Sequence, residues 1–198
     1  MKKLNKKGFT LIELLAVIII LGVLLLIAVP SVSKYIIDSR MKTYNTNLSN
    51  FVSAVANEVN AMDYNSDYNF KSTEILLVPF KNIEIERGDN TKSPFAQYTE
   101  KYSFVLVVRK YDDKGTPLGF EYYVQAYDDN GYGANIAKPT DVKVQALAAE
   151  GLVEIPGFGG SEATELELPS SITIPSQVET VRIVGLTEKT ATGPNVTK

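Results

Sequence analysis

A single acidic residue near the start of a long apolar segment is the feature that most constrains this chain. Glu13 follows the sequence Lys-Lys-Gly-Phe-Thr-Leu-Ile at residues 6–12, and the run from Leu14 to Val29 contains no polar side chain. An ionised carboxylate inside a membrane-length helix costs about 2.5 to 3.5 kcal/mol on insertion scales. Glu13 therefore needs a partner of opposite charge.

Residues 6–13 resemble the class III signal of type IV prepilins, which has a short basic leader, a Gly-Phe junction and a glutamate five residues after the cut. The resemblance is specific over about residues 6–40 and extends only to architecture beyond them. It implies that prepilin peptidase, a membrane-embedded aspartyl protease, cleaves between Gly8 and Phe9 and N-methylates Phe9. It also places the Glu13 carboxylate against the Phe9 amine of a neighbouring subunit, and such opposite charges attract strongly where water is excluded.

Two other interpretations of this segment exist. An ordinary secretory signal has an apolar region of about 7 to 15 residues followed by a small-residue cleavage site, whereas this run is longer and ends in Ala28-Val29-Pro30-Ser31. A plain single-pass anchor needs about 20 apolar residues, and the 22 residues from Phe9 to Pro30 satisfy that need. A plain anchor, however, gives no reason for the Gly-Phe junction or for Glu13.

The basic leader indicates the orientation of the precursor. The positive-inside rule keeps this end of the chain on the cytoplasmic side, and everything after Pro30 then lies outside the membrane. We therefore expect a single-pass precursor in the cytoplasmic membrane that later enters an extracellular pilus. The leader lysines are Lys2, Lys3, Lys6 and Lys7.

The composition argues against several functions. Removal of residues 1–8 deletes four lysines and no acid, which takes the net charge from −3 to −7, so strong nonspecific nucleic-acid binding is not expected. The chain has no Cys and no His, which removes the usual zinc ligands and the nucleophile–histidine pairs of hydrolases. We expect no catalytic residue, no metal and no cofactor. Many Gram-negative pilins close a carboxy-terminal loop with a disulfide, and the lack of Cys here suggests a Gram-positive type.

The helix is predicted to continue beyond the membrane segment, from about Phe9 to Met62, a length of about 80 Å. Apolar residues in its second half recur at steps of three or four, which predicts one stripe that faces a globular head. Turn-forming residues at 63–67 end the pattern. The residues expected to pack on the head are Ile37, Met41, Tyr44, Leu48, Phe51, Val55 and Val59, with Met62 at the end of the stripe.

Gly22 and Pro30 interrupt the apolar half of this helix. Proline removes a backbone hydrogen bond and clashes with the preceding turn, so a kink near Pro30 is expected. In filaments of type IV pilins the stretch between a glycine and a proline at corresponding places is unwound, and the resemblance implies that residues 22–30 melt likewise. The alternative for Gly22 is a small packing residue, because glycine is common in membrane helices.

The head, residues 63–198, is interpreted from periodicity. Residues 64–99 are expected to be an irregular connection with a short element or two, including the apolar cluster at 75–78. Residues 102–111 and 119–127, separated by the turn Asp112–Pro117, predict an antiparallel hairpin whose first strand is central. The alternation in the second strand places Phe120, Tyr122, Val124 and Ala126 toward the helix, and Tyr123, Gln125 and Tyr127 away from it.

The remainder of the head gives weaker signals. A short helix is predicted from Thr140 to Ala149, ended by Gly151. Residues 156–171 are expected to form an exposed loop, and residues 172–174 and 181–186 short strands. The tail from Lys189 is expected to be frayed.

Together these patterns predict an α+β chain with a pilin-like fold, in which a long amino-terminal helix, kinked near Pro30, packs on an antiparallel sheet. The predicted parts are a leader at 1–8, a membrane or filament-core half of the helix at 9–30, an amphipathic half at 31–62 and the head at 63–198. No internal repeat is evident in the sequence.

Two local patterns resemble binding or modification sites. The turns that begin Asp112-Asp113 and Asp128-Asp129 offer clustered oxygen ligands that suit calcium, but neither has the spacing of a calcium loop. Because Asp and Asn are the default turn formers, solvated turns are the favoured interpretation. The glycosylation sequons at Asn47 and Asn195 are interpreted as chance matches in a bacterial protein.

Three functions are compatible with the amino terminus. The first is a structural subunit of a type IV pilus for adhesion or twitching motility; the second is a pseudopilin of a secretion or competence machine; the third is a minor adhesive pilin. The resemblance implies the same partners for the first: other copies of the chain, prepilin peptidase, the pilus assembly platform with its ATPase, and the membrane before assembly. The size of the head favours the pilus subunit.

Overall fold

The computed structural model describes residues 10–64, 72–85, 88–185 and 188–197, and the chain divides into two compact units, residues 1–40 and 41–198. The helix α1 extends from Leu11 to Tyr64, so its first part belongs to one unit and its second part to the other. The second unit contains the sheet and is the head described below.

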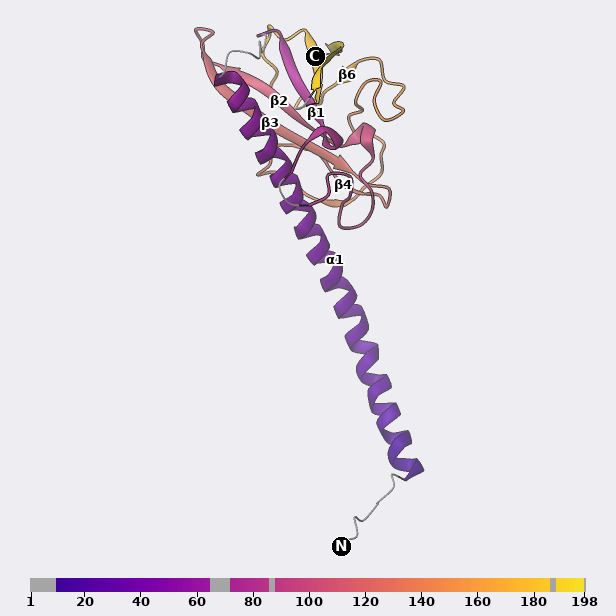
Figure 1. The fold of residues 1–198 in the computed structure, drawn as a ribbon. Coiled ribbons are helices and arrows are strands. Elements are labelled where there is room, and N and C mark those ends of the chain that lie inside the picture. Colours follow the sequence, from indigo (N-terminus) through magenta and orange to yellow (C-terminus); the bar gives the residue numbers. More distant parts are fainter. Residues whose placement is uncertain (1–9, 65–71, 86–87, 186–187, 198) are drawn as a thin grey trace. The chain divides into compact units, whose positions relative to one another are not determined.

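Eight strands form one sheet in the order β5-β4-β3-β2-β1-β7-β8-β6. Neighbouring strands are antiparallel except for the β1–β7 and β6–β8 pairs, which are parallel. Two short 3-10 helices, η1 (Phe80–Asn82) and η2 (Glu100–Tyr102), precede β2 (Figure 1). The strands are β1 (Glu74–Pro79), β2 (Phe104–Tyr111), β3 (Pro117–Tyr127), β4 (Tyr132–Ala137), β5 (Gln145–Ala146), β6 (Leu166–Glu167), β7 (Thr180–Gly185) and β8 (Glu188–Thr197).

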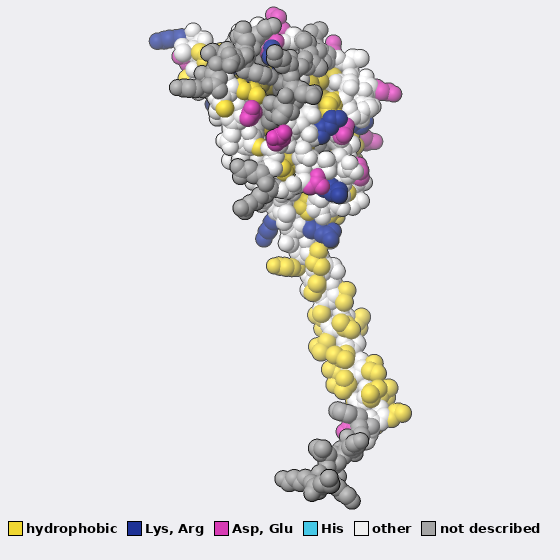
Figure 2. All heavy atoms as spheres, in the orientation of Figure 1, with side chains coloured by type: hydrophobic (Ala, Val, Ile, Leu, Met, Phe, Trp, Pro, Cys, Tyr) yellow, Lys and Arg dark blue, Asp and Glu magenta, His cyan; other side chains and the backbone are white. Residues whose placement is uncertain are grey.

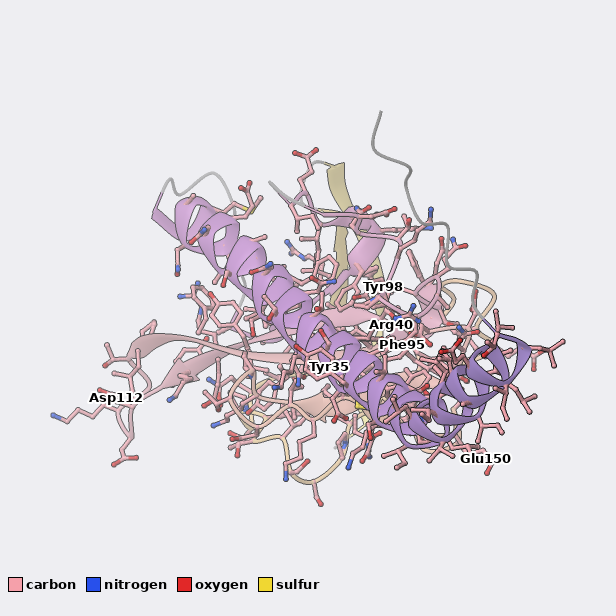
Figure 3. The ribbon with its side chains drawn as sticks, turned by 90° about the horizontal axis from the view of Figure 1, so that it is seen from below. Tyr35, Arg40, Phe95, Tyr98, Asp112 and Glu150 are labelled. Atoms are coloured by element: carbon pink, nitrogen blue, oxygen red, sulfur yellow. The ribbon has the colours of Figure 1, made fainter. Side chains whose placement is uncertain are left out.

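The second part of α1 packs on one face of this sheet, which confirms the predicted α+β architecture. The ring of Phe51 stacks on that of Phe80 with centroids 4.0 Å apart, and Tyr98 meets both rings edge-on. Tyr98 and Phe95 lie against the helix, where each contacts Tyr44 (Figure 3). The helix side chains buried in this cluster are Tyr44, Leu48, Phe51, Val52, Val55 and Val59.

The residues at the two ends of the predicted stripe are less buried than those in its middle. Met41 is partly buried against the same cluster, and Met62 is half-buried. Ile37 belongs to the first unit, and its side chain is 40% exposed. The apolar stripe that lies in the head thus begins at Met41.

Strand β2 is buried on both faces, as its apolar sequence predicted. Val105 and Val107 point into the cluster beside α1, whereas Phe104, Leu106 and Val108 point into a second cluster on the opposite face. This alternation follows from the two-residue period of a strand. Residues 152–178 cover the second face with side chains that include Val153, Ile155, Leu166, Ile172 and Val178.

The β2–β3 hairpin is confirmed, with Leu106 opposite Tyr123 and Arg109 opposite Phe120. The side chains of β3 point to the predicted faces of the sheet. Val124 and Ala126 lie in the cluster beside α1, and Tyr123 lies in the second cluster. Tyr123 and Gln125 nevertheless are buried, since the carboxy-terminal half of the head covers that face. The β3–β4 contact is so close that a Cβ atom at Gly133 would collide with the carbonyl oxygen of Ala126.

The predicted helix from Thr140 to Ala149 is wrong. This stretch is irregular except for β5, which pairs with β4 at the edge of the sheet. The Thr140 hydroxyl donates to the Asp141 carboxylate rather than to a helix end, and the Leu147 amide donates to the Gly131 carbonyl oxygen at 2.9 Å. Pairing with the open edge of β4 therefore satisfies backbone groups that the helix would have satisfied internally.

Two further expectations for the head are corrected. Residues 172–174 form no strand, because a turn closes between the Ile172 amide and the Pro169 carbonyl oxygen at 3.0 Å. The tail from Lys189 is not frayed, since β8 pairs with β7 and β6. The expected connection at residues 64–99, irregular with a short element or two, is confirmed, and its apolar cluster lies in the short central strand β1, whose six residues are all buried. The strand predicted at 181–186 is confirmed as β7.

The division of the chain predicts that the head folds without the apolar part of α1. Deletion of residues 1–34 removes most of the exposed apolar side chains and leaves the stripe that packs on the sheet. The fragment should be monomeric and soluble and should unfold in one cooperative transition. Sedimentation together with a urea melt tests this, and aggregation at micromolar concentration would contradict it.

A buried ion pair joins β7 to β1, and its loss should destabilise the head. Nη2 of Arg182 lies 2.6 Å from Oε2 of Glu74, and both side chains are largely buried. Glu74→Gln or Arg182→Met alone leaves one buried charge unpaired and should lower the free energy of unfolding by about 3 kcal/mol. The double variant Glu74→Leu/Arg182→Met should recover most of this loss in denaturant titrations. Equal stability of all these variants and wild type would show that the pair contributes nothing.

Candidate functional site

The start of α1 is built around Thr10 and Glu13. The Thr10 amide and hydroxyl both donate to Oε2 of Glu13, at 2.8 and 2.7 Å, and the Glu13 amide donates to the Thr10 hydroxyl oxygen at 3.3 Å. The first helical bond runs from the Leu14 amide to the Thr10 carbonyl oxygen at 3.2 Å. This reciprocal arrangement is a capping box, which satisfies amides that a helix start otherwise leaves without partners.

Thr10 is a functional residue that the sequence interpretation did not single out. The signal was present, because a Thr followed three residues later by Glu and then by an apolar run marks a helix start. The capping box holds the Glu13 carboxylate by hydrogen bonds but leaves its negative charge uncompensated. Gly8 and Phe9, the predicted cleavage and methylation residues, lie outside the described residues.

The part of α1 that follows the capping box exposes its apolar side chains on all sides. Every large apolar residue from Leu11 to Ile37 is between 40 and 87% exposed in the single chain. Figure 2 shows these hydrophobic side chains gathered along this stretch of the helix. By length and composition the helix can cross a membrane. Lipid or other subunits must cover such a surface.

Gly22 and Pro30 both lie inside the continuous helix. A Cβ atom at Gly22 would meet no atom of the chain within 4 Å, so no packing within the subunit requires a glycine there. Near Pro30 the hydroxyls of Ser31 and Ser33 donate to the carbonyl oxygens of Ile27 and Val29 at 3.3 and 3.0 Å, bonds that tend to bend a helix. The kink and the melting of residues 22–30 stay predictions.

The Asp-rich turns use their first carboxylates for backbone bonds. The Asp112 carboxylate accepts from the amides of Lys114 and Thr116, and the bond from Thr116 is the main reason that the pKa of Asp112 lies below its ordinary value. The Asp128 carboxylate accepts from the Ser93 hydroxyl and from the Asn130 and Tyr132 amides. Asp128 is fully buried, so the interpretation of a solvated turn is wrong for this residue.

Residues 3–29 match the family model described as the prokaryotic N-terminal methylation motif. The amino-terminal segment therefore fits a prepilin of the type IV pilin kind, anchored in the membrane by its apolar helix. The motif implies processing by prepilin peptidase and assembly of the pilus type in general. Proteins of this kind are structural. Comparisons with curated proteins and with solved structures gave no match.

The capping box predicts a specific effect of Thr10 on the start of the helix. Thr10→Ala removes the hydroxyl that bonds both the amide and the carboxylate of Glu13, whereas Thr10→Ser keeps it. Loss of such a cap costs about 1 kcal/mol, so the Glu13 and Leu14 amides should exchange hydrogen roughly fivefold faster in Thr10→Ala. Amide exchange of the full chain in detergent micelles measures this, and identical rates in the two variants would exclude the capping role.

Proposed function

We propose that this chain is a structural subunit of a type IV pilus, which the apolar part of α1 assembles into the filament core while the heads form its surface. The observation that carries the proposal is a single carboxylate, Glu13, at the start of a helix whose apolar surface has no cover within its own unit. A filament of parallel helices offers both an apolar environment and a cation, the amine of Phe9 in an adjacent subunit.

The energetics of this pair explain why assembly is specific. The carboxylate is unfavourable in an apolar environment when alone, and the attraction to an amine grows as water is excluded. Docking in the wrong axial register leaves the Glu13 charge unpaired, so the ion pair selects the register while the apolar side chains supply most of the contact area. The capping box orients the carboxylate at the helix start, where the amine of a neighbour would arrive.

The proposed life cycle has two stages. The precursor is held in the cytoplasmic membrane, where prepilin peptidase cuts between Gly8 and Phe9 and methylates the new amine. The assembly platform and its ATPase then extract the subunit into an extracellular pilus used for adhesion or motility. The large head, residues 41–198, supports this role over that of a pseudopilin, whose head is usually shorter.

The role of Glu13 can be tested by removing its charge. Glu13→Gln keeps the shape of the side chain and Glu13→Val removes the burial penalty, so both should insert into the membrane at least as well as wild type. Neither can bind the neighbouring amine, and their amount in sheared filaments should fall roughly tenfold or more. Cells are sheared, and the subunit is quantified in the filament and membrane fractions.

Two controls separate docking from processing and folding. Gly8→Val places a side chain at the scissile bond and should block cleavage, so it shows how an unprocessed subunit distributes. Leu21→Val changes an apolar side chain of the same helix and should assemble like wild type. Wild-type amounts of Glu13→Val in the filament fraction, with cleavage at Phe9, would refute a docking role for Glu13.

A further inference from the structure

A cavity of about 800 Å³ lies in the head beside the second apolar cluster. Its walls come from β3, from β4 and from the segment of residues 151–171 that covers this face of the sheet. The lining combines apolar side chains, among them Ile136, Leu152 and Leu168, with carboxylates and backbone polar groups. The carboxylates belong to Glu154, Glu162, Glu165 and Glu167.

Buried polar bonds hold one wall of the cavity in place. The side chain of Gln125 is buried in β3, and its amide nitrogen donates to the carbonyl oxygens of Tyr102 and Val153 at 3.1 and 2.7 Å. Its amide oxygen accepts from the Val153 amide at 3.0 Å. Both polar atoms of the Gln125 side chain therefore form hydrogen bonds with the backbone of Val153, which hold the covering segment on the sheet. Such a wall is formed before any ligand arrives.

Glu154 fixes the other end of the same wall. Its carboxylate accepts from the hydroxyls of Tyr102 and Ser161, each at 2.8 Å, and lies 3.3 Å from Nζ of Lys101. The bond from Tyr102 is the main reason that the pKa of Glu154 lies below its ordinary value. Gly159 packs so closely on the Lys101 amide that a Cβ atom would lie 2.7 Å from it. Glu154 therefore has a structural role, and the ligand contacts considered below are those of Glu162 and Glu167.

The covering segment and the residues that flank it carry charged side chains of negative sign only. Residues 144–181 contain six glutamates and neither Lys nor Arg. Glu162 and Glu167 are exposed at the cavity, and within the described part of the chain neither forms an ion pair. The lining also includes the apolar side chains of Leu152 and Leu168. An ordered cavity that presents carboxylates beside aliphatic side chains fits a ligand that has a cationic head on an aliphatic stem.

We propose that this cavity binds an alkylammonium or guanidinium group carried on an aliphatic chain, as in a free polyamine or in a Lys or Arg side chain of a peptide. Glu162 and Glu167 contact the cation, and Ile136, Leu152 and Leu168 contact the methylene groups. Because the carboxylates are exposed, binding is weak and falls as salt is raised.

The test uses the full chain in a non-ionic detergent at about 0.15 M salt, near the ionic strength of physiological solutions. Spermidine serves as the polyamine probe, and a fluorescent peptide Ala-Lys-Leu-Ala with blocked ends serves as the peptide probe. The variant Glu162→Gln/Glu167→Gln changes the cavity, and Glu150→Gln/Glu179→Gln makes the same charge change outside it. Calorimetry and fluorescence anisotropy measure the two affinities, and thermal melts verify that each variant is folded.

We expect the cavity variant to bind at least one probe roughly tenfold more weakly than wild type and the control variant to change affinity by less than about twofold. Thr164→Arg, which places a guanidinium at the cavity, should abolish binding. Whether spermidine, the peptide or both bind identifies the source of the cation. No binding of either probe to wild type, or equal weakening in the two glutamine variants, would overturn the proposal.

Discussion

The Thr10–Glu13 capping box stands at the start of a helix that buries none of its large apolar side chains over the next two dozen residues. Hydrogen bonds from Thr10 reduce the desolvation penalty of the carboxylate, but they do not neutralise it. Within an apolar environment the remaining charge attracts any cation that reaches the same depth. In the filament that we propose, this charge selects the neighbouring subunit and its register, a selection that the apolar side chains alone do not provide.

A change in the helix pattern separates assembly from folding. Up to Ile37 apolar side chains occupy every face of α1, whereas from Met41 they follow one stripe that the sheet covers. The core of the head therefore includes helix residues such as Tyr44 and Phe51, which are buried against the sheet. Substitutions in one part should leave the other intact, because among the described helix residues the exposed apolar side chains and those buried against the sheet are different sets.

Local sequence signals predicted the helix and the β2–β3 hairpin. The pairing between distant segments has no such local signal and was not predicted. The turn at Asp112–Pro117 and the alternation in β3 lie within a few residues of each other, and so does the Thr10–Glu13 pair. In contrast β1 pairs in parallel with β7, about a hundred residues later, and the sequence of β8 has no apolar alternation. Residues 140–149 were misassigned because the free edge of β4, which only the folded sheet creates, determines their backbone bonds.

Buried and half-buried polar contacts hold the carboxy-terminal half of the head, where the lack of Cys excludes a disulfide. Gln125, Glu154 and the Glu74–Arg182 pair each join this half to an earlier strand or helix, at positions where a slipped register would leave polar groups unsatisfied. Two of these contacts, those of Gln125 and Glu154, lie in the wall of the acidic cavity beside the second cluster. That cavity and α1 lie on opposite faces of the sheet. A ligand bound in the cavity therefore leaves the packing of the second part of α1 on the sheet undisturbed.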